Sequence, residues 1–336
     1  MIDAFIGVFR YLAIVVLAWG CGCSSAIASA APDPIALTPE RVARDVYYVH
    51  GDSGQASVAN RGFTSNAGFV VTSDGVVVFD TLGTPALGKA LLAAIGKITT
   101  QPVRYVILSH YHADHVYGLQ PFKAAKAQVW ARTEGQIYLR SDLARERLEE
   151  RKKTLAAWIG PDTQVLPADR WLTLAAGQTS RFRLGKTDFT LISAGFAHAN
   201  GDMMLFVENQ SVLFAGDVFF SGRLPFVVDG NTKGWLKAIA SMKALGAQRV
   251  VPGHGTVSTD VERDLATTER YIAFLRKQMG AAVNDLRSFD EAYQATDWTP
   301  FEHLPTFDAA NRRNAYSVYL EMQAELLADP PVDQRK

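Results

Sequence analysis

Three histidines and an aspartate lie within six residues of one another, in the segment His110-Tyr111-His112-Ala113-Asp114-His115. Imidazole and carboxylate groups suit Zn²⁺ and its neighbours in the first transition row. Because His110 and His112 are two residues apart, they project to the same side of an extended segment and can share one metal ion. Asp114 and His115 follow where the chain turns into the next predicted helix, so they face a second position. The spacing therefore predicts a metal site with two positions.

Strands must position these side chains, because each candidate ligand comes at or after the end of an apolar run. The motif follows Val103–Leu108, which is predicted to be a buried strand. In an α/β architecture, binding residues gather on the loops at strand ends. Three further candidate ligands occupy such places, namely His198 after 190–193, Asp217 after 212–216 and His254 after 250–251. We therefore expect distant parts of the chain to share one site.

Strand and helix patterns alternate along the remaining sequence, which predicts an α/β fold class. The order is strands, helices with the motif, then strands and helices again. We expect two similar halves packed as two sheets back to back, with helices outside. The main helices are predicted at Pro85–Lys97, Val116–Lys126, Thr133–Trp158, Thr232–Leu245, Asp260–Gln278 and Asn311–Leu327.

The first thirty residues resemble a secretory signal peptide. Arg10 closes a short basic region, Tyr11–Gly20 is apolar, and Ala28-Ser29-Ala30 has the small residues of a cleavage site. Cleavage after Ala30 predicts a periplasmic or secreted protein with no stable membrane association, and an uncleaved membrane anchor is the alternative. The expected parts are a signal peptide at 1–30, a lead-in at 31–43, an αβ domain at 44–258, C-terminal helices on the same domain at 259–328, and a flexible tail at 329–336.

The charge balance and the positions of the cysteines argue against a nucleic-acid ligand and against thiolate metal ligands. Lys plus Arg and Asp plus Glu both number 34, so no net field exists to attract nucleic acid. We therefore expect a small-molecule substrate and no nucleic-acid partner. Both cysteines, Cys21 and Cys23, lie in the predicted leader. A cleaved protein would have no thiolate, so its metal site would have to be built from His and Asp.

The five separated motifs around these candidate ligands resemble, in type and order, those of the metallo-β-lactamase superfamily of two-metal hydrolases. The resemblance covers roughly 45–255 and implies an αββα sandwich of two mixed sheets flanked by helices, with the metal site at one edge. It also implies the ligand sets. His110, His112 and His198 would hold the first metal, Asp114, His115 and His254 the second, and Asp217 would bridge them together with a water or hydroxide.

The function that the resemblance implies is hydrolysis. Two Zn²⁺ ions, with iron or manganese as alternatives, would activate a bridging hydroxide that attacks a small ester, thioester, lactone or lactam. We expect Asp114 to be catalytic, because it would orient this nucleophile. The absence of a cysteine ligand argues against the β-lactamases that use one. The run Phe214–Phe226 and the leader most resemble periplasmic zinc hydrolases associated with quinoprotein and sulfur-oxidation systems, so a quinoprotein-system partner is possible.

Two alternatives of different chemistry remain open from the sequence. One is a mononuclear iron dioxygenase that acts on persulfides and uses the first group of histidines on the same fold. The other is a metal-binding partner of a quinoprotein system with little turnover. Two zinc ions per chain favour hydrolysis, whereas one iron with oxygen consumption favours oxidation.

Two residues are candidate substrate contacts, and one is a candidate support for a ligand. Arg223 could bind a substrate carboxylate or a similar anion, or instead lie over Leu224 and Phe226 at the surface. Asn200 could donate to a developing oxyanion, or only shape the loop after His198. Asp80 could cap the next helix or support a metal ligand.

Overall fold

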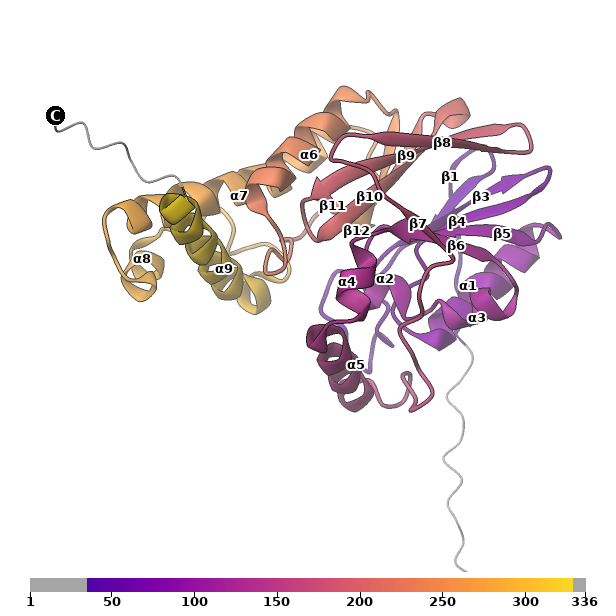
Figure 1. Cartoon of the computed structure of the whole chain (residues 1–336), viewed down its shortest axis with the longest axis horizontal. Coiled ribbons are helices and arrows are strands. Elements are labelled where there is room, and N and C mark those ends of the chain that lie inside the picture. The colour runs from indigo at the N-terminus through magenta and orange to yellow at the C-terminus, as the bar shows by residue number, and fades with distance from the viewer. Residues whose placement is uncertain (1–34, 329–336) are drawn as a thin grey trace, which may run out of the picture. The chain divides into compact units, whose positions relative to one another are not determined.

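The computed structural model describes residues 35–328, so the expected leader at 1–30 and tail at 329–336 lie outside the described residues. Two β-sheets form its centre (Figure 1). The first has the strand order β1 (Glu40–Ala43), β2 (Val46–Val49), β3 (Ala67–Thr72), β4 (Gly75–Phe79), β5 (Val103–Ile107), β6 (Gln128–Arg132) and β7 (Arg170–Leu172). The second has the order β12 (Arg249–His254), β11 (Val212–Phe220), β10 (Asn200–Val207), β9 (Thr187–Phe196) and β8 (Thr179–Leu184).

Both sheets are mixed, as expected. Strands β1 to β4 pair antiparallel and β4 to β7 pair parallel. In the second sheet, β8 to β11 pair antiparallel and β11 to β12 pair parallel. The inner faces of the two sheets share one apolar cluster, in which Val77 and Ile107 of the first sheet join Leu191 and Phe214 of the second. Burial of these faces from water holds the sheets together.

Helices cover the outer face of each sheet (Figure 1). On the first sheet lie α1 (Pro85–Ile98), α2 (Ala113–Val116) and α3 (Gln120–Ala124), and nearby along the chain are α4 (Gly135–Leu139) and α5 (Asp142–Thr154). On the second lie α6 (Thr232–Ala244) and α7 (Val261–Asn284), joined by α8 (Phe289–Ala295) and α9 (Phe307–Ala328). These helices share an apolar cluster with the second sheet. The expected αββα sandwich is confirmed.

Two predicted helices are wrong, because each is broken into two. The predicted helix Val116–Lys126 consists of α2 and α3, separated at Gly118, where an added Cβ would lie 1.9 Å from the Thr81 carbonyl oxygen. The Gly118 amide donates at 2.9 Å to the Leu82 carbonyl oxygen and not within a helix, and Pro121 lies in the first turn of α3. The predicted helix Thr133–Trp158 consists of α4 and α5, because the Ser141 hydroxyl caps α5 by accepting from the Ala144 amide.

Three boundaries also need correction. The expected lead-in at 31–43 contains β1, which pairs with β2 and so belongs to the first sheet. Asp217 does not end its strand but lies inside β11, which continues to Phe220. Helix α7 extends to Asn284, and the unpredicted helix α8 follows, with a capping box between Ser288 and Glu291.

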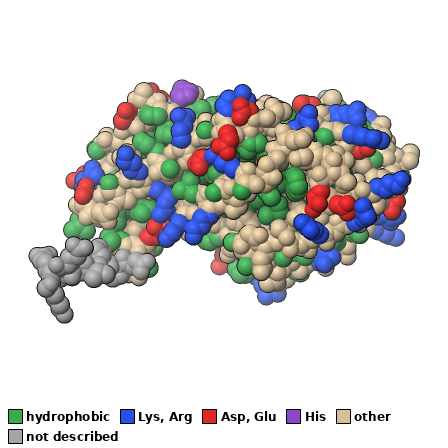
Figure 2. All heavy atoms as spheres, turned by 90° about the horizontal axis from the view of Figure 1, so that it is seen from above, with side chains coloured by type: hydrophobic (Ala, Val, Ile, Leu, Met, Phe, Trp, Pro, Cys, Tyr) green, Lys and Arg blue, Asp and Glu red, His purple; other side chains and the backbone are tan. Residues whose placement is uncertain are grey.

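The surface of the described part mixes charges of both signs. On the face shown in Figure 2, basic and acidic side chains are interspersed instead of being gathered into one basic patch. This agrees with the balanced composition of 34 basic and 34 acidic residues. Within residues 35–328, no helix is both long enough and apolar enough to span a bilayer.

Candidate metal centre

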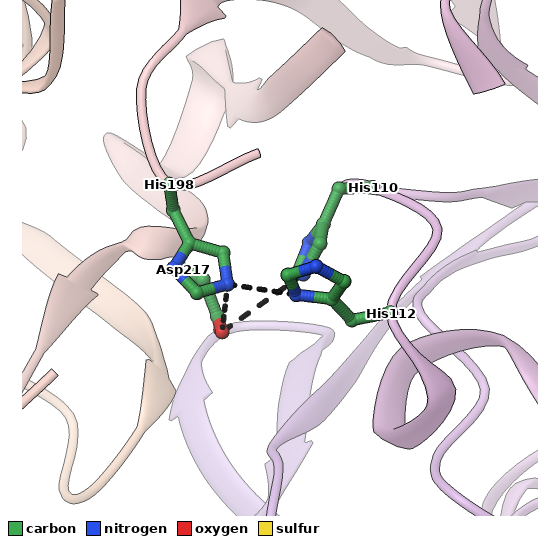
Figure 3. A group of neighbouring side chains, drawn as sticks. All are labelled: His110, His112, His198 and Asp217. Atoms are coloured by element: carbon green, nitrogen blue, oxygen red, sulfur yellow. Dashed lines mark hydrogen bonds and ion pairs between the residues drawn. The ribbon is translucent and has the colours of Figure 1, made fainter. Parts of the chain in front are cut away.

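Strand ends, loops and the short helix α2 at one edge of the sandwich bring all of the predicted ligands together. The side chains fall into two groups whose candidate ligand atoms lie within 4.8 Å of one another. The first group is His110, His112, His198 and Asp217, and the second is Asp114, His115 and His254. Figure 3 shows the first group, in which His110 and His112 face His198 and Asp217 from the opposite half of the fold. The structure thus brings the predicted ligand side chains together, with Asp217 in the first group.

Asp217 lies between the two groups. Its Oδ2 atom is 3.2 Å from His198 Nε2 and 3.4 Å from His254 Nε2. Its Oδ1 atom is 3.2 Å from His115 Nε2. One carboxylate therefore faces donors of both groups, which is the position of a bridging ligand. The packing leaves little freedom, because a Cβ at Gly253 would lie 1.9 Å from Asp217 Oδ1.

Hydrogen bonds orient three of the imidazole rings. His110 Nδ1 lies 2.9 Å from Ser109 Oγ, His115 Nδ1 lies 2.8 Å from Asp80 Oδ2, and His254 Nδ1 lies 2.7 Å from the Thr64 carbonyl oxygen. These acceptors favour a proton on Nδ1, which leaves the Nε2 lone pair directed into the centre.

Several polar atoms in the centre are buried without a hydrogen-bond partner. These atoms are Nε2 of His110, Nε2 of His115 and Oδ1 of Asp217. The last two lie 3.2 Å apart, but with the ring proton on Nδ1 of His115 both are acceptors and neither satisfies the other. Buried polar groups are rarely left without a partner, so these atoms mark a place where a ligand is needed. Imidazole nitrogens and carboxylate oxygens in this arrangement fit divalent metal ions.

Burial and neighbouring charges favour the metal-binding forms of His110, His198 and Asp114, whereas the carboxylates around His115 raise the pKa of that ring. Burial, together with the neighbouring imidazoles, lowers the pKa of His110 well below its usual value and keeps that ring neutral. Burial also lowers the pKa of His198, to about 3. Burial opposes ionisation of Asp114, yet His115 and His254 lower the pKa of that carboxyl to about 2. Neutral imidazoles and ionised carboxylates are the forms that bind metal.

Asp80 takes the supporting role that the sequence left open. Its carboxylate accepts from the Ser109 amide and the Ser109 hydroxyl, both at 2.8 Å, and from His115 Nδ1. Thr84, not Asp80, caps α1, since the Thr84 side chain accepts from the Leu87 amide. Asp80 is buried, so its carboxylate interacts with these partners and not with solvent.

His112 is held differently from the other histidines. Its Nδ1 atom faces the centre, 2.9 Å from His198 Nε2, while its Nε2 atom lies 3.1 Å from Asp229 Oδ2. Asp229 in turn pairs with Arg147 of α5. Burial opposes ionisation of Asp229, yet the contacts with His112 and Arg147 lower the pKa of this carboxyl well below its usual value.

Sequence reasoning missed Asp229, Arg147 and Asn66. Asn66 Nδ2 donates to the carbonyl oxygens of Pro252 and Gly255, which holds the loop around His254. A polar residue at the start of an apolar strand was the one available signal for Asn66. Nothing in the spacing of Asp229 or Arg147 points to the centre, because each lies far along the chain from His112.

A cavity of about 330 Å³ opens onto the centre. Its walls include ligands of both groups, residues 54–56 of the loop after β2, Arg223, and Ala309 and Arg313 of α9. Arg223 is buried at 1% exposure, so it is not a surface side chain. Asn200 is exposed at the start of β10, where it pairs with Phe196, and it is not among the residues that line the cavity. We therefore do not propose Asn200 as a substrate contact.

Solved structures with the same fold include hydrolases. An inverting sec-alkylsulfatase from Pseudomonas sp. superimposes with a TM-score of 0.66 at 19% identity, over 84% of this chain and 50% of that one. A metallo-beta-lactamase from Pontibacter korlensis superimposes with a TM-score of 0.55 at 19% identity, over 70% of this chain and 99% of that one.

Sequence comparisons agree with the fold. A linear primary-alkylsulfatase from Pseudomonas sp. is 23% identical over 263 residues, which are 68% of this chain and 49% of that protein. A metallo-beta-lactamase from Chryseobacterium indologenes is 23% identical over 197 residues, which are 57% of this chain and 72% of that protein. The chain thus spans about half the length of the alkylsulfatase. The family model described as the metallo-beta-lactamase superfamily matches residues 60–254, and the chain therefore belongs to this superfamily.

Proposed function

We propose that this protein is an exported hydrolase that uses two zinc ions to cleave a small ester, thioester, lactone or lactam. The observation that carries the proposal is the pair of donor groups joined by Asp217, with buried Nε2 lone pairs that have no other partner. Iron or manganese would fit the same nitrogen and oxygen donors. The relatives in the superfamily support hydrolysis as the reaction class.

The metal ions would supply a water that ionises near neutral pH and a positive charge that polarises the bond to be cleaved. Residues of both groups would hold them, with His110, His112 and His198 at one position and Asp114, His115 and His254 at the other. The hydrogen bonds to Nδ1 of His110, His115 and His254 fix the rings in advance, so that little reorganisation accompanies metal binding.

Asp114 is the residue that we propose to be catalytic. Its Oδ2 atom is 3.3 Å from His254 Nε2 and 3.3 Å from Thr64 Oγ1, and the side chain keeps 27% exposure toward the cavity. It can therefore contact both the centre and an incoming substrate. As an ionised carboxylate it would accept a hydrogen bond from the attacking water and orient it.

The test is metal analysis of the purified protein followed by a substrate screen. We expect about two zinc ions per chain and hydrolysis of at least one ester, thioester, lactone or β-lactam. Sulfate esters belong in the screen because one relative is an alkylsulfatase. One iron per chain with oxygen consumption on a persulfide would overturn the proposal in favour of a dioxygenase. A fully metallated protein that cleaves nothing in the screen would favour a binding partner with little turnover.

Export is a separate part of the proposal with its own test. It rests on the predicted leader at 1–30. Fractionation of cells that produce the protein should recover it in the periplasm or the medium, with Ala31 as the first residue. Recovery in the membrane fraction with the N-terminus intact would show that the leader is kept as an anchor.

A further inference from the structure

Arg223 is a buried cation without a carboxylate partner. Its side chain is 1% exposed, and its Nε atom has no hydrogen-bond partner. Within residues 35–328 no carboxylate oxygen lies within ion-pair distance of it. The nearest polar contacts are long, since Nη1 is 3.4 Å from both the Gly54 carbonyl oxygen and His254 Nδ1. A buried guanidinium is costly to leave in this state, so its surroundings are incomplete without an anion.

The guanidinium is held in place beside the centre. Its Cζ atom lies 5.9 Å from the ring centre of Phe220 and 5.4 Å from that of Phe226. These contacts fix a planar group whose remaining N–H donors suit two oxygen atoms of a carboxylate, sulfate or phosphate. Because Arg223 lines the cavity together with Asp114 and His254, such a group would lie next to the metal positions.

Arg313 of the C-terminal helix also lines this cavity, as do Arg147 and Arg151 of α5. Arg313 of α9 is exposed, and within the described part of the chain it has no ion-pair partner. The neighbouring Arg312 is different, because it pairs with Asp290 and lies over the rings of Phe289 and Tyr293. Of two adjacent arginines, one is therefore used by the fold and the other faces the cavity.

The acidic residues of the cavity form no ion pair with Arg223 or Arg313. Asp114 and Asp217 belong to the centre, and Asp229 is paired with His112 and Arg147. Glu150 is exposed at the rim. Of the seven candidate ligands, only Asp114 and Asp217 are carboxylates, so they would offset only part of the charge of two divalent ions. A metal-loaded cavity would therefore carry additional positive charge.

We propose that the substrate carries an oxyanion, which is a carboxylate, sulfate or phosphate group. Arg223 binds this group beside the metal centre, and Arg313 selects for it at the mouth of the cavity. The inference rests on the proposed function for the cleavage itself and adds the substrate class. It also gives the C-terminal helix α9 a role in specificity in addition to its packing.

A matched pair of substrates tests the inference. 4-Nitrophenyl hydrogen succinate and its methyl ester differ only in the free carboxylate. With the zinc-loaded protein we expect a lower KM for the acid. Arg223→Gln should raise KM for the acid by about tenfold to a hundredfold, and so lower the preference for the acid over its methyl ester. Arg223→Lys keeps the charge but not the planar fork, and should restore part of the preference.

Arg313 allows a test without risk to the core. Arg313→Gln should raise KM for the acid by about twofold to fivefold, as expected for an exposed charge. Arg312→Gln is the matched control, because it makes the same change of charge one residue away, and it should leave the preference unchanged. Equal KM values for acid and methyl ester, or equal effects of Arg313→Gln and Arg312→Gln, would overturn the inference.

Anion binding provides a readout that does not need turnover. Titration calorimetry of the zinc-loaded protein with sulfate, phosphate and acetate should show binding that Arg223→Gln weakens. The anion that binds most tightly identifies the charged group of the substrate. If no substrate is cleaved but this binding is lost in Arg223→Gln, the proposed function fails and the inference stands. If the methyl ester is cleaved as well as the acid and anion binding is the same in both proteins, the inference fails and the proposed function stands.

Discussion

The two sides of the metal centre are supported in different ways. On the buried side, His115 and its partner Asp80 have side chains that are 0% and 1% exposed. On the cavity side, His112 and its partner Asp229 have side chains that are 17% and 28% exposed, and Arg147 completes the contact from α5. The buried side belongs to the core of the fold, whereas the partly exposed side belongs to the wall of the cavity.

This difference in exposure indicates which residues stabilise the fold and which affect mainly the metal centre. A buried carboxylate with three donors cannot be removed without leaving polar groups unsatisfied in the core. A carboxylate at the cavity wall can exchange its partners for water. We therefore expect changes on the buried side to affect both folding and metal binding, and changes at the wall to affect metal binding with little effect on folding.

The largest effect is expected for Asp80→Ala. The change leaves the Ser109 amide, the Ser109 hydroxyl and His115 Nδ1 without their acceptor. The free energy of unfolding should fall by about 3–5 kcal/mol, and metal at the second position should be lost. Urea denaturation and metal analysis measure the two effects. Asp74→Ala, at an exposed turn residue, is the control and should change neither.

Asp114→Asn probes a ligand that lies between the two sides. Its side chain contacts the buried imidazole of His254 and is also open to the cavity. We expect turnover to fall by about 10²–10⁴-fold, as for loss of a general base, while the protein stays folded. Steady-state kinetics with parallel metal analysis make the measurement. Unchanged turnover at full metal content would refute the catalytic role of Asp114.

Asp229→Asn should separate metal binding from folding. The substitution keeps the shape of the side chain but removes the charge that orients His112 through Nε2. Metal affinity should weaken by about tenfold to a hundredfold, as for other partners of metal-bound histidines. Competition with a chelator measures the affinity, and thermal unfolding of the metal-free protein should change little. Glu150→Gln, also at the cavity rim, serves as the control. A large loss of thermal stability without a loss of metal affinity would contradict the proposed difference between the two sides.

The smallest effect is expected for Arg147→Gln. Arg147 acts on His112 only through Asp229, and the side chains of this ion pair are 27% and 28% exposed. Because exposed ion pairs contribute roughly 0.2–1 kcal/mol, metal affinity should weaken by at most about fivefold. The same chelator competition measures it. An effect as large as that of Asp229→Asn would mean that Arg147 has a direct role in the cavity.

The ligand side chains could be predicted because their signal is local. His110 to His115 form one motif, and the other candidates follow or interrupt apolar strands, whose ends meet in space for reasons of sheet geometry. The two sheets could be predicted in the same way, from the alternation of strands and helices. The broken helices at Gly118 and Ser141 could not, because a close backbone approach and a cap overrode an otherwise helical pattern.

The sequence by itself determined which residue types are available for the centre, namely imidazoles and carboxylates that follow apolar runs. Strand periodicity and ligand chemistry are both properties of short segments. Only the tertiary structure decided what surrounds them. The pairing of Asp229 with His112, the burial of Arg223 and the approach of Arg313 from α9 join residues that are distant along the chain. No short segment encodes such contacts, since they arise from the packing of whole elements against one another.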